Sequence, residues 1–437
     1  MAAGGKLFGT DGVRGEAGTF LTAELALALG RAATAGSPAE RPQVLIIRDT
    51  RESGDMLEAA LAAGVTAAGG DALLGGILPT PAAPLLVSRY GFDLAVVISA
   101  SHNPFADNGI KFFGPDAFKL TDEHELEIER ALDEPRPGAA GIGRVRRLHG
   151  TPEDYLRELE TRFAGLDLTG MRILLDCANG ATHRVAPEIF ARLGATVTAL
   201  HAEPDGRNIN AGCGSTHVAA LAGRMAGGDH DAGFAFDGDG DRVLAVDRTG
   251  GVVDGDELLA IAALHRRVPG VAVTVMTNYG FHAAMASAGI EVATTKVGDR
   301  YVLEELRARG WELGGEQSGH LIDMGFVPSG DGVASALLAL ESLAGADLAE
   351  RAAMDKLPQR LVNVRVGDRD AAMAAPEVAA AVAEEDAALA GRGRVLLRPS
   401  GTEPLVRVMV EAPTAEEADA VCERLAELVA AAAGQPA

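Results

Sequence analysis

The stretch VVISASHNPFADNGIKFF, from Val96 to Phe113, joins an apolar strand to a polar loop in the middle of an otherwise hydrophobic region. Val96, Val97 and Ile98 form a β-branched run that is typical of a buried strand. The run leads directly into SASHNP, and a turn is expected at Asp107, Asn108 and Gly109. A polar loop held between a strand and a tight turn presents its side chains rather than packing them, so the stretch predicts a functional loop.

The sequence around this stretch alternates apolar helical segments with short apolar strands, which predicts sheets covered by helices. The alternation begins near residue 20, is interrupted by DEPRPGAAGIGRVRRLHG (133–150), and starts a third round near Gly255. After Pro358 it gives way to a pattern that indicates a small antiparallel sheet with helices. The predicted fold class is therefore α/β, with three similar mixed-sheet α/β domains and a C-terminal α+β domain around a central cleft.

The length of 437 residues also requires several domains, because single hydrophobic cores stop growing near roughly 250 to 300 residues. The pattern breaks predict four domains, at 1–155, 156–254, 255–360 and 361–437.

The composition is that of a soluble globular protein, with 47% hydrophobic and 23% charged residues. The formal net charge of −23 argues against binding to nucleic acid or to anionic membranes, which both need a basic face. No signal peptide and no run of about 18 apolar residues is visible, so we expect a cytoplasmic protein. Cys177, Cys213 and Cys422 lack metal-site spacing and are interpreted as buried thiols.

Ser101 is the natural nucleophile of the SASHNP loop, although an ordinary polar turn would have a similar sequence. Lys111 returns close to it after Gly109. A cation beside a serine can hold an anion or accept the serine proton, which favours the functional interpretation.

The segment FAFDGDGDRV places three carboxylates, on Asp237, Asp239 and Asp241, directly after another apolar strand. Carboxylates this close repel one another unless a cation neutralises them, so the segment predicts a hard divalent ion, for which Mg²⁺ is the best candidate. A calcium loop would need glycine in place of Arg242 and an acid in place of Arg248. Arg242 is instead suited to bind a phosphate on the metal.

Three further segments carry polar groups of this kind. LGGEQSGHLI predicts a grip on sugar hydroxyls or, alternatively, a hairpin with a polar tip. RPSGTEPLVR predicts a phosphate cradle or a structural turn. FGTDGVRG could extend into the same cleft or form a glycine-rich entry turn. The candidate residues are Glu316, Ser318 and His320 in the first segment, Arg398, Ser400, Gly401, Thr402 and Arg407 in the second, and Thr10 and Arg14 in the third.

A nucleophile, a metal loop, a sugar grip and a phosphate cradle together predict phosphoryl transfer on a phosphosugar. The chain resembles the α-D-phosphohexomutases, because FGTDGVRG, ISASHNPFADNGIKFF, DGDGDR, GEQSGH and RPSGTEPLVRVMVE match the signatures of that family in order over almost the whole length. The residues within these motifs are most similar to those of the bacterial subgroup that interconverts glucosamine 6-phosphate and glucosamine 1-phosphate. The product of that reaction feeds the synthesis of UDP-N-acetylglucosamine and cell-wall precursors.

The resemblance implies a role for each candidate. Ser101 would be the phosphoserine and, with the three aspartates, would hold one Mg²⁺ per chain. Arg14, Lys111 and His102 would assist transfer, Glu316 and Ser318 would bind sugar hydroxyls together with His320, and the RPSGTEPLVR residues would clamp the phosphate that does not react. TKVGDRY adds Lys296 and Asp299 as weaker substrate contacts. A departure from the family is Ile47, where we expect glycine.

The resemblance further implies a sugar 1,6-bisphosphate as intermediate and activator, and a small phosphosugar as the partner. It also suggests a homodimer, although the sequence does not indicate which residues would form the interface. A separate fourth domain suggests that this domain closes over the ligand. The alternatives are a mutase for mannose or glucose phosphates, a phosphosugar sensor without catalysis, and a metal-dependent phosphatase.

Overall fold

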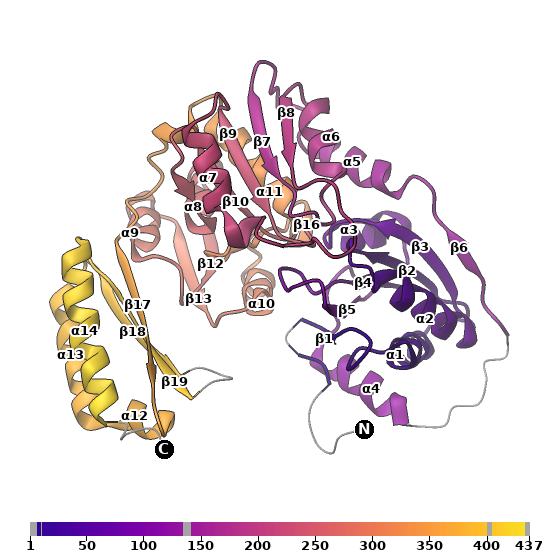
Figure 1. The fold of residues 1–437 in the computed structure, drawn as a ribbon, viewed down its shortest axis with the longest axis horizontal. Helices are drawn as coiled ribbons and strands as arrows, with labels where there is room; N and C mark the ends of the chain where they lie inside the picture. Colours follow the sequence, from indigo (N-terminus) through magenta and orange to yellow (C-terminus); the bar gives the residue numbers. More distant parts are fainter. Residues whose placement is uncertain (1–6, 10, 134–140, 400–403, 433–437) are drawn as a thin grey trace. The chain divides into compact units, whose positions relative to one another are not determined.

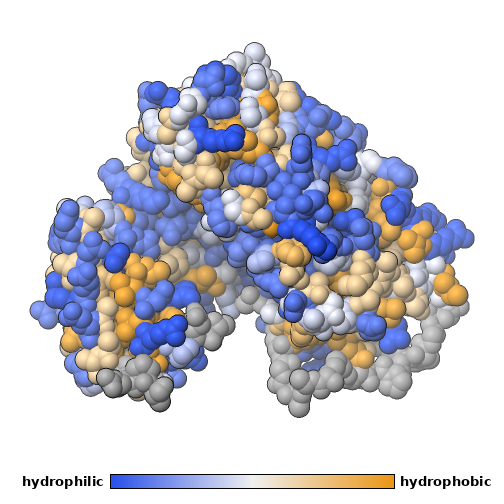
Figure 2. Space-filling model, viewed as in Figure 1, coloured by the Kyte–Doolittle hydropathy of each residue, from blue (hydrophilic) through white to orange (hydrophobic). Residues whose placement is uncertain are grey.

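The computed structural model describes residues 7–9, 11–133, 141–399 and 404–432 (Figure 1). The chain divides into two compact units, Met1–Val275 with Ala293–Arg351, and Met276–Val292 with Ala352–Ala437. On the face shown in Figure 2, hydrophilic residues dominate and hydrophobic ones lie between them in smaller groups. None of the helices in the described ranges is both long and apolar enough to cross a membrane.

The first sheet has six strands in the order β1-β5-β4-β2-β3-β6. Strands β2, β3, β4 and β6 run parallel, whereas β5 is antiparallel to both β4 and β1. The sheet is therefore mixed, as predicted. Its strands are β1 (Val13–Glu16), β2 (Gln43–Arg48), β3 (Asp71–Ile77), β4 (Leu94–Ile98), β5 (Asp107–Phe113) and β6 (Val145–Arg147).

Helices α1 (Ala23–Ala35) and α2 (Gly54–Ala67) pack tightly together in this region. Thr22 caps α1 by accepting a hydrogen bond from the Leu25 N–H group. The helices approach closely because Gly30 and Gly64 face each other's backbones, where a Cβ atom would lie 2.7 Å from the Leu61 carbonyl and 2.1 Å from the Leu27 carbonyl. The region also contains α3 (Ala82–Tyr90) and α4 (Asp122–Asp133).

The second sheet has five strands in the order β11-β10-β9-β7-β8. Strand β7 is parallel to β8 and β9, while β10 is antiparallel to β9. The strands are β7 (Arg172–Asp176), β8 (Thr196–Leu200), β9 (Ala232–Phe236), β10 (Val243–Asp247) and β11 (Val252–Val253). The helices are α5 (Thr151–Arg162), α6 (Val185–Arg192), the 3₁₀ turn η1 (Ser215–His217) and α7 (Ala219–Ala226).

The third sheet has the order β13-β12-β14-β15-β16. Strand β14 is parallel to β12 and antiparallel to β15. Its strands are β12 (Gly270–Thr274), β13 (Glu291–Thr295), β14 (Leu313–Gly315), β15 (Leu321–Asp323) and β16 (Val327–Gly330). The helices are α8 (Gly255–Arg266), α10 (Asp299–Arg309), α11 (Gly332–Leu343) and the 3₁₀ turn η2 (Leu348–Glu350).

The second unit contains an antiparallel sheet in the order β17-β19-β18, with helices packed on an apolar core. It also includes α9 (Tyr279–Ala288), where the Tyr279 N–H group donates to the buried Glu411 side chain at 2.8 Å. The other elements are β17 (Gln359–Arg365), α12 (Arg369–Ala374), α13 (Pro376–Leu389), β18 (Arg394–Pro399), β19 (Leu405–Glu411) and α14 (Ala415–Ala432). The predicted class, three mixed α/β sheets and a C-terminal α+β domain, is confirmed.

One arrangement repeats in the first three sheets. A buried parallel strand is followed directly by an antiparallel neighbour, in the pairs β4–β5, β9–β10 and β14–β15. The connecting loops contain SASHNP, DGDGDR and EQSGH, respectively. The sequence placed the first two loops directly after apolar strands and left a hairpin as an alternative for the third. All three loops are hairpin connections, which sheet hydrogen bonds hold from both sides. The predicted turn at Asp107, Asn108 and Gly109 is wrong, because these residues already belong to β5 and the chain reverses before them.

Candidate active site

Ser101 lies at the tip of the β4–β5 loop with its hydroxyl buried against the second sheet. Its Oγ atom donates a hydrogen bond to Asp237 Oδ2 at 2.6 Å, and lies 3.3 Å from His102 Nδ1. The Ser101 backbone has a φ of 51°, in the left-handed region that residues with a side chain rarely adopt. A buried hydroxyl on a strained loop, aimed at a carboxylate, is suited to act as a nucleophile.

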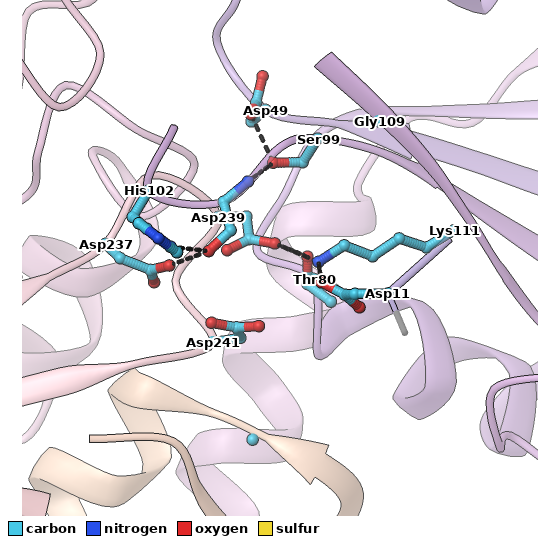
Figure 3. A network of polar contacts seen from close by, with 12 residues as sticks. Asp11, Asp49, Thr80, Ser99, His102, Gly109, Lys111, Asp237, Asp239 and Asp241 are labelled. Atoms are coloured by element: carbon cyan, nitrogen blue, oxygen red, sulfur yellow. Dashed lines mark hydrogen bonds and ion pairs between the residues drawn. The ribbon is translucent and has the colours of Figure 1, made fainter. Parts of the chain in front are cut away.

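The three aspartates of the β9–β10 loop form a buried carboxylate cluster (Figure 3). One oxygen from each lies within 4.8 Å of the others. The Oδ1 atoms of Asp239 and Asp241 are buried and accept no hydrogen bond from the described residues. Oxygen atoms left open in this way fit a hard divalent cation.

The electrostatics of the cluster are those of a site that needs a cation. Burial, followed by repulsion from Asp241 and Asp239, raises the pKa of the Asp237 carboxyl well above its ordinary value. Burial alone would also raise the pKa of Asp241, but His320, Lys111 and Arg242 outweigh it and hold that pKa far below its ordinary value. The neighbouring cations therefore neutralise only part of the cluster.

Lys111 lies on β5 and extends from the first sheet into this cluster. Its Nζ atom is 2.9 Å from Asp239 Oδ2 and 3.1 Å from Asp11 Oδ2. Burial lowers the pKa of the Lys111 ammonium, but the two carboxylates outweigh it and raise that pKa above its ordinary value. Lys111 is therefore protonated at neutral pH and can stabilise an anion, whereas it is poorly suited to accept the Ser101 proton.

His102 is half-buried beside Ser101 and has the opposite tendency. Burial, followed by the positive charges of Arg242 and Arg14, lowers the pKa of its imidazole. Its Nδ1 atom lies 3.4 Å from Arg242 Nη1. The Arg242 N–H group donates to Asp237 Oδ1 at 3.1 Å, so the residue that follows the DGDGD sequence is tied to the cluster by its backbone. A neutral imidazole next to a hydroxyl can exchange a proton with it.

The third loop contributes His320 to the same site. The buried His320 ring has its Nδ1 atom 3.6 Å from Asp241 Oδ2 and its Nε2 atom 3.7 Å from Asp299 Oδ2. Glu316 is half-buried and accepts a hydrogen bond from the Gly298 N–H group at 3.1 Å, while Ser318 is exposed. The predicted sugar-binding residues thus separate into His320, which contacts the metal-loop aspartate, and Glu316 and Ser318, which line the loop surface.

A chain of alternating charges connects the first and third sheets. Asp11 pairs with Arg14 and Lys111, and it also contacts Lys119 Nζ at 2.6 Å. Lys119 in turn contacts Asp299 Oδ2 at 2.6 Å. Lys296, in contrast, is exposed, and its ammonium lies 6.0 Å from the centre of the Tyr301 ring.

In the second unit, Arg398 and Arg407 lie opposite each other across the β18–β19 ladder. Burial, followed by the positive charge of Arg407, lowers the pKa of Arg398. Within the described residues neither side chain forms an ion pair, so two guanidinium groups are held together without a carboxylate between them. This favours an anion site. The candidates Ser400, Gly401, Thr402 and Thr10 lie outside the described residues.

Comparisons with known proteins give one consistent result. Four family models for phosphoglucomutase/phosphomannomutase match in order: α/β/α domain I at residues 5–137, domain II at 153–251, domain III at 254–361 and the C-terminal domain at 361–428. A phosphoglucosamine mutase of Moorella thermoacetica is 54% identical over 94% of this chain and 96% of its own length. The chain belongs to the phosphoglucomutase/phosphomannomutase family. The family predicted from the five sequence motifs is thereby confirmed.

Other members of the family extend the comparison. A phosphoglucosamine mutase of Mycolicibacterium paratuberculosis is 50% identical, covering 98% of this chain and all of its own. Among solved structures, a phosphoglucomutase/phosphomannomutase family protein of Burkholderia thailandensis has a TM-score of 0.82 at 24% identity, covering 99% of this chain and 98% of its own. The Aspergillus fumigatus N-acetylphosphoglucosamine mutase, solved with GlcNAc-6P and magnesium, has a TM-score of 0.68 at 18% identity, covering 98% and 96%. These two likenesses concern the fold.

Several residues around the site of this family member were not singled out from the sequence. Asp11 lies within the motif FGTDGVRG, and its place there beside Arg14 was the one local signal. Lys119, which pairs with Asp11 in the fold, has no local signal. Thr80, whose Oγ1 atom donates to Asp239 Oδ2 at 2.6 Å, comes from a distant segment.

A second group of possible metal ligands, Asp176, His201 and Cys213, lies in the second domain. All three cysteines are buried free thiols, as predicted. The fold nevertheless brings Cys213 close to two other ligand types, which the spacing along the chain did not indicate. Asp176 already accepts backbone hydrogen bonds from Ala178 and Gly214, both at 3.0 Å.

Proposed function

We propose that this family member interconverts glucosamine 6-phosphate and glucosamine 1-phosphate by way of a phosphoserine at Ser101 and a glucosamine 1,6-bisphosphate. The observation that carries the proposal is the buried Ser101 hydroxyl, held 2.6 Å from a carboxylate of an incompletely neutralised aspartate cluster. The full-length relatives at about 50% identity, which are phosphoglucosamine mutases, support the choice of sugar.

We further propose that Ser101 and the three aspartates bind one Mg²⁺ per chain. Bound there, the ion would stabilise the negative charge of the phosphoryl group during its transfer. Lys111, protonated and wedged between Asp239 and Asp11, would stabilise the same charge, with Arg14 as a neighbour. The remaining assignments rest on the family resemblance: Arg242, Arg398, Ser400, Gly401, Thr402 and Arg407 for phosphate, Glu316, Ser318 and His320 for the sugar, and Thr10, Lys296 and Asp299 as weaker contacts.

The chemical step can be written on these residues. The phosphorus–oxygen bond to Ser101 Oγ breaks as a bond forms to the 6- or 1-oxygen of the sugar, which loses its proton, and Ser101 regains a proton. His102 is the proposed proton carrier, because its lowered pKa leaves it neutral and it lies 3.3 Å from Ser101 Oγ. The reverse transfer, from the other end of the bisphosphate, restores the phosphoserine.

Three broader expectations remain part of the proposal. The chain would work in the cytoplasm on a small phosphosugar, without nucleic acid or membrane partners, and could form a homodimer. The domain limits 1–155, 156–254, 255–360 and 361–437 are proposed as well. A bound 1,6-bisphosphate would act as activator by restoring the phosphoserine.

Turnover of purified protein tests the choice of substrate. We expect the rate with glucosamine 1-phosphate to exceed those with glucose 1-phosphate and mannose 1-phosphate. A preference for either of the latter would establish the phosphoglucomutase or phosphomannomutase alternative instead. Ser101→Ala should lower turnover by about 10⁴-fold or more while the protein stays folded. Full activity in that variant would remove the proposed nucleophile, and release of free phosphate would indicate a phosphatase.

A further inference from the structure

The backbone of Ser101 is held by a set of side chains that do not belong to the site described above. Its left-handed conformation is unusual for a residue with a side chain, so other groups must stabilise it. On the amide side, the Ser101 N–H group donates to Ser99 Oγ at 3.0 Å. The Ser99 hydroxyl donates in turn to Asp49 Oδ2 at 2.6 Å. The amide of the nucleophile is thereby anchored to a buried carboxylate at the end of β2.

On the carbonyl side, two side chains from different domains meet at the same oxygen. Arg51 Nη2 and Asn210 Nδ2 each donate to the Ser101 carbonyl at 2.9 Å. The same two groups donate to the Asn103 carbonyl, at 2.9 and 3.1 Å. The loop that carries the nucleophile is therefore bound twice by the same pair of donors.

Arg51 is fully buried and acts on the whole loop. Its Nη1 atom donates to the carbonyls of Pro104 and Asp107, and its Nε atom donates to Asp49 at 2.8 Å. A guanidinium group presents its donors in a fixed plane, and here that plane is surrounded by loop carbonyls. Lysine could not reproduce this arrangement.

Asn210 belongs to the second domain, which also carries the aspartate cluster. It has a φ of 58°, and its own N–H group donates to the Ala178 carbonyl at 2.9 Å. Gly238, between two of the clustered aspartates, lies against the Ser101 carbonyl, where a Cβ atom would approach to 2.5 Å. The metal loop and the Asn210 loop thus meet at one backbone oxygen of the first domain.

We propose that Arg51 and Asn210 are positioning residues for phosphoryl transfer. They fix the Ser101 carbonyl, and through it the direction of the Ser101 Oγ atom toward the aspartate cluster. Asn210 has the additional effect of aligning the nucleophile of the first domain with the metal loop of the second. This inference rests on the proposed function, in which Ser101 carries the phosphoryl group.

Two substitutions at Asn210 separate positioning from folding. Asn210→Gly removes the donor and tolerates the positive φ, whereas Asn210→Asp keeps the shape and the φ preference but replaces the donor with an acceptor. Asn208→Asp is the matched control. The half-buried Asn208 side chain donates to the Glu203 carbonyl at 2.9 Å and accepts from the Asp205 N–H group at 3.0 Å, all within its own loop.

The expected result is a split between kcat and KM. Both Asn210 variants should lower kcat by about 10- to 100-fold, since a misplacement of about 1 Å can cost that much, with KM changed by less than about twofold. The Asn208→Asp control should keep both constants near wild type. Phosphorylation of Ser101 by glucosamine 1,6-bisphosphate, followed by intact mass well below the melting temperature of each variant, should slow by the same factor as kcat in the folded fraction.

Two outcomes would overturn the inference. The first is that the Asn210 variants take up phosphate and turn over like wild type. The second is that they only melt at a lower temperature, while their folded fraction keeps the wild-type kcat. Wild-type protein that takes up no phosphate on Ser101 would instead overturn the proposed function. The two failures are therefore distinguishable in one experiment.

Discussion

Two groups of potential metal ligands lie in the second domain, and they differ in how their oxygen atoms are satisfied. In the cluster of Asp237, Asp239 and Asp241, two buried oxygens accept no hydrogen bond from the described residues. In the group of Asp176, His201 and Cys213, both oxygens of Asp176 accept backbone N–H groups, and His201 Nδ1 lies 3.0 Å from one of them.

The first domain contains a similar carboxylate, Asp49, whose oxygens also accept hydrogen bonds from the protein. Asp49 directly follows β2, and Asp176 is the last residue of β7. Each carboxylate accepts a hydrogen bond from the backbone N–H group of the residue two positions later. Asp49 then accepts the Ser99 hydroxyl, while Asp176 accepts Gly214 N–H. Both carboxylates therefore tie neighbouring loops to a strand end. We infer that open oxygens mark the catalytic cluster, whereas satisfied ones mark a structural group.

The largest effect is expected for a substitution in the aspartate cluster, which should lower activity. Asp237→Asn should lower kcat by about 10³-fold, because it removes a charge from the proposed metal ligands and one of the two oxygens that accept from the Ser101 hydroxyl and the Arg242 N–H group. The melting temperature of the metal-free protein should stay the same or rise, since the substitution relieves repulsion within a buried cluster. Activity assays and thermal melts check both parts. A variant that keeps its activity would contradict the assignment of the cluster.

Removal of the metal should have the next largest effect. Treatment with EDTA is expected to abolish turnover, and Mg²⁺ to restore it. At 100 times its Kd, Mg²⁺ should stabilise the folded protein by about 2.7 kcal/mol. This stabilisation should persist in Asp176→Asn and disappear in Asp237→Asn. Equal stabilisation of both variants would show that the ion binds elsewhere.

Asp176→Asn should act on stability rather than on chemistry. Loss of one charged acceptor for a buried N–H group is expected to lower the free energy of unfolding by about 1 to 3 kcal/mol. Urea denaturation measures this change. The kcat of the folded fraction should stay near wild type. A loss of activity similar to that of Asp237→Asn would mean that the two groups do not differ as described.

The smallest effect concerns the thiol of the structural group. Burial, followed by the negative charge of Asp176, raises the pKa of Cys213 to about 11. Because the thiolate is the reactive form and the Cys213 side chain is buried, labelling of the folded protein with iodoacetamide should be slow at pH 8. Peptide mapping identifies the labelled residue. Rapid labelling of Cys213 at pH 8 would contradict the described environment.

The sequence predicted the parts of the site that are local along the chain. Ser101 and the three aspartates each follow a short apolar run, and the structure places them at the ends of β4 and β9. The class of fold was predictable for the same reason, since helix and strand periodicity are local properties.

Residues that act across domains could not be found in this way. Lys119 meets Asp299 across 180 positions of sequence, and Asn210 meets Ser101 across 109. Such pairs are created by the packing of one sheet region on another, which periodicity does not encode. His320 illustrates the same limit. Its motif suggested a sugar contact, whereas the fold places it 3.6 Å from Asp241. Its role at the sugar stays a prediction.

Ser101 is the proposed carrier of the phosphoryl group. This role is tested most directly by intact-mass measurement and peptide mapping of protein incubated with glucosamine 1,6-bisphosphate, before and after addition of excess glucosamine 6-phosphate. We expect one added phosphate located on Ser101, absent from Ser101→Ala and transferable to the sugar phosphate. A phosphate found on another residue, or one on Ser101 that the sugar phosphate never accepts, would contradict it.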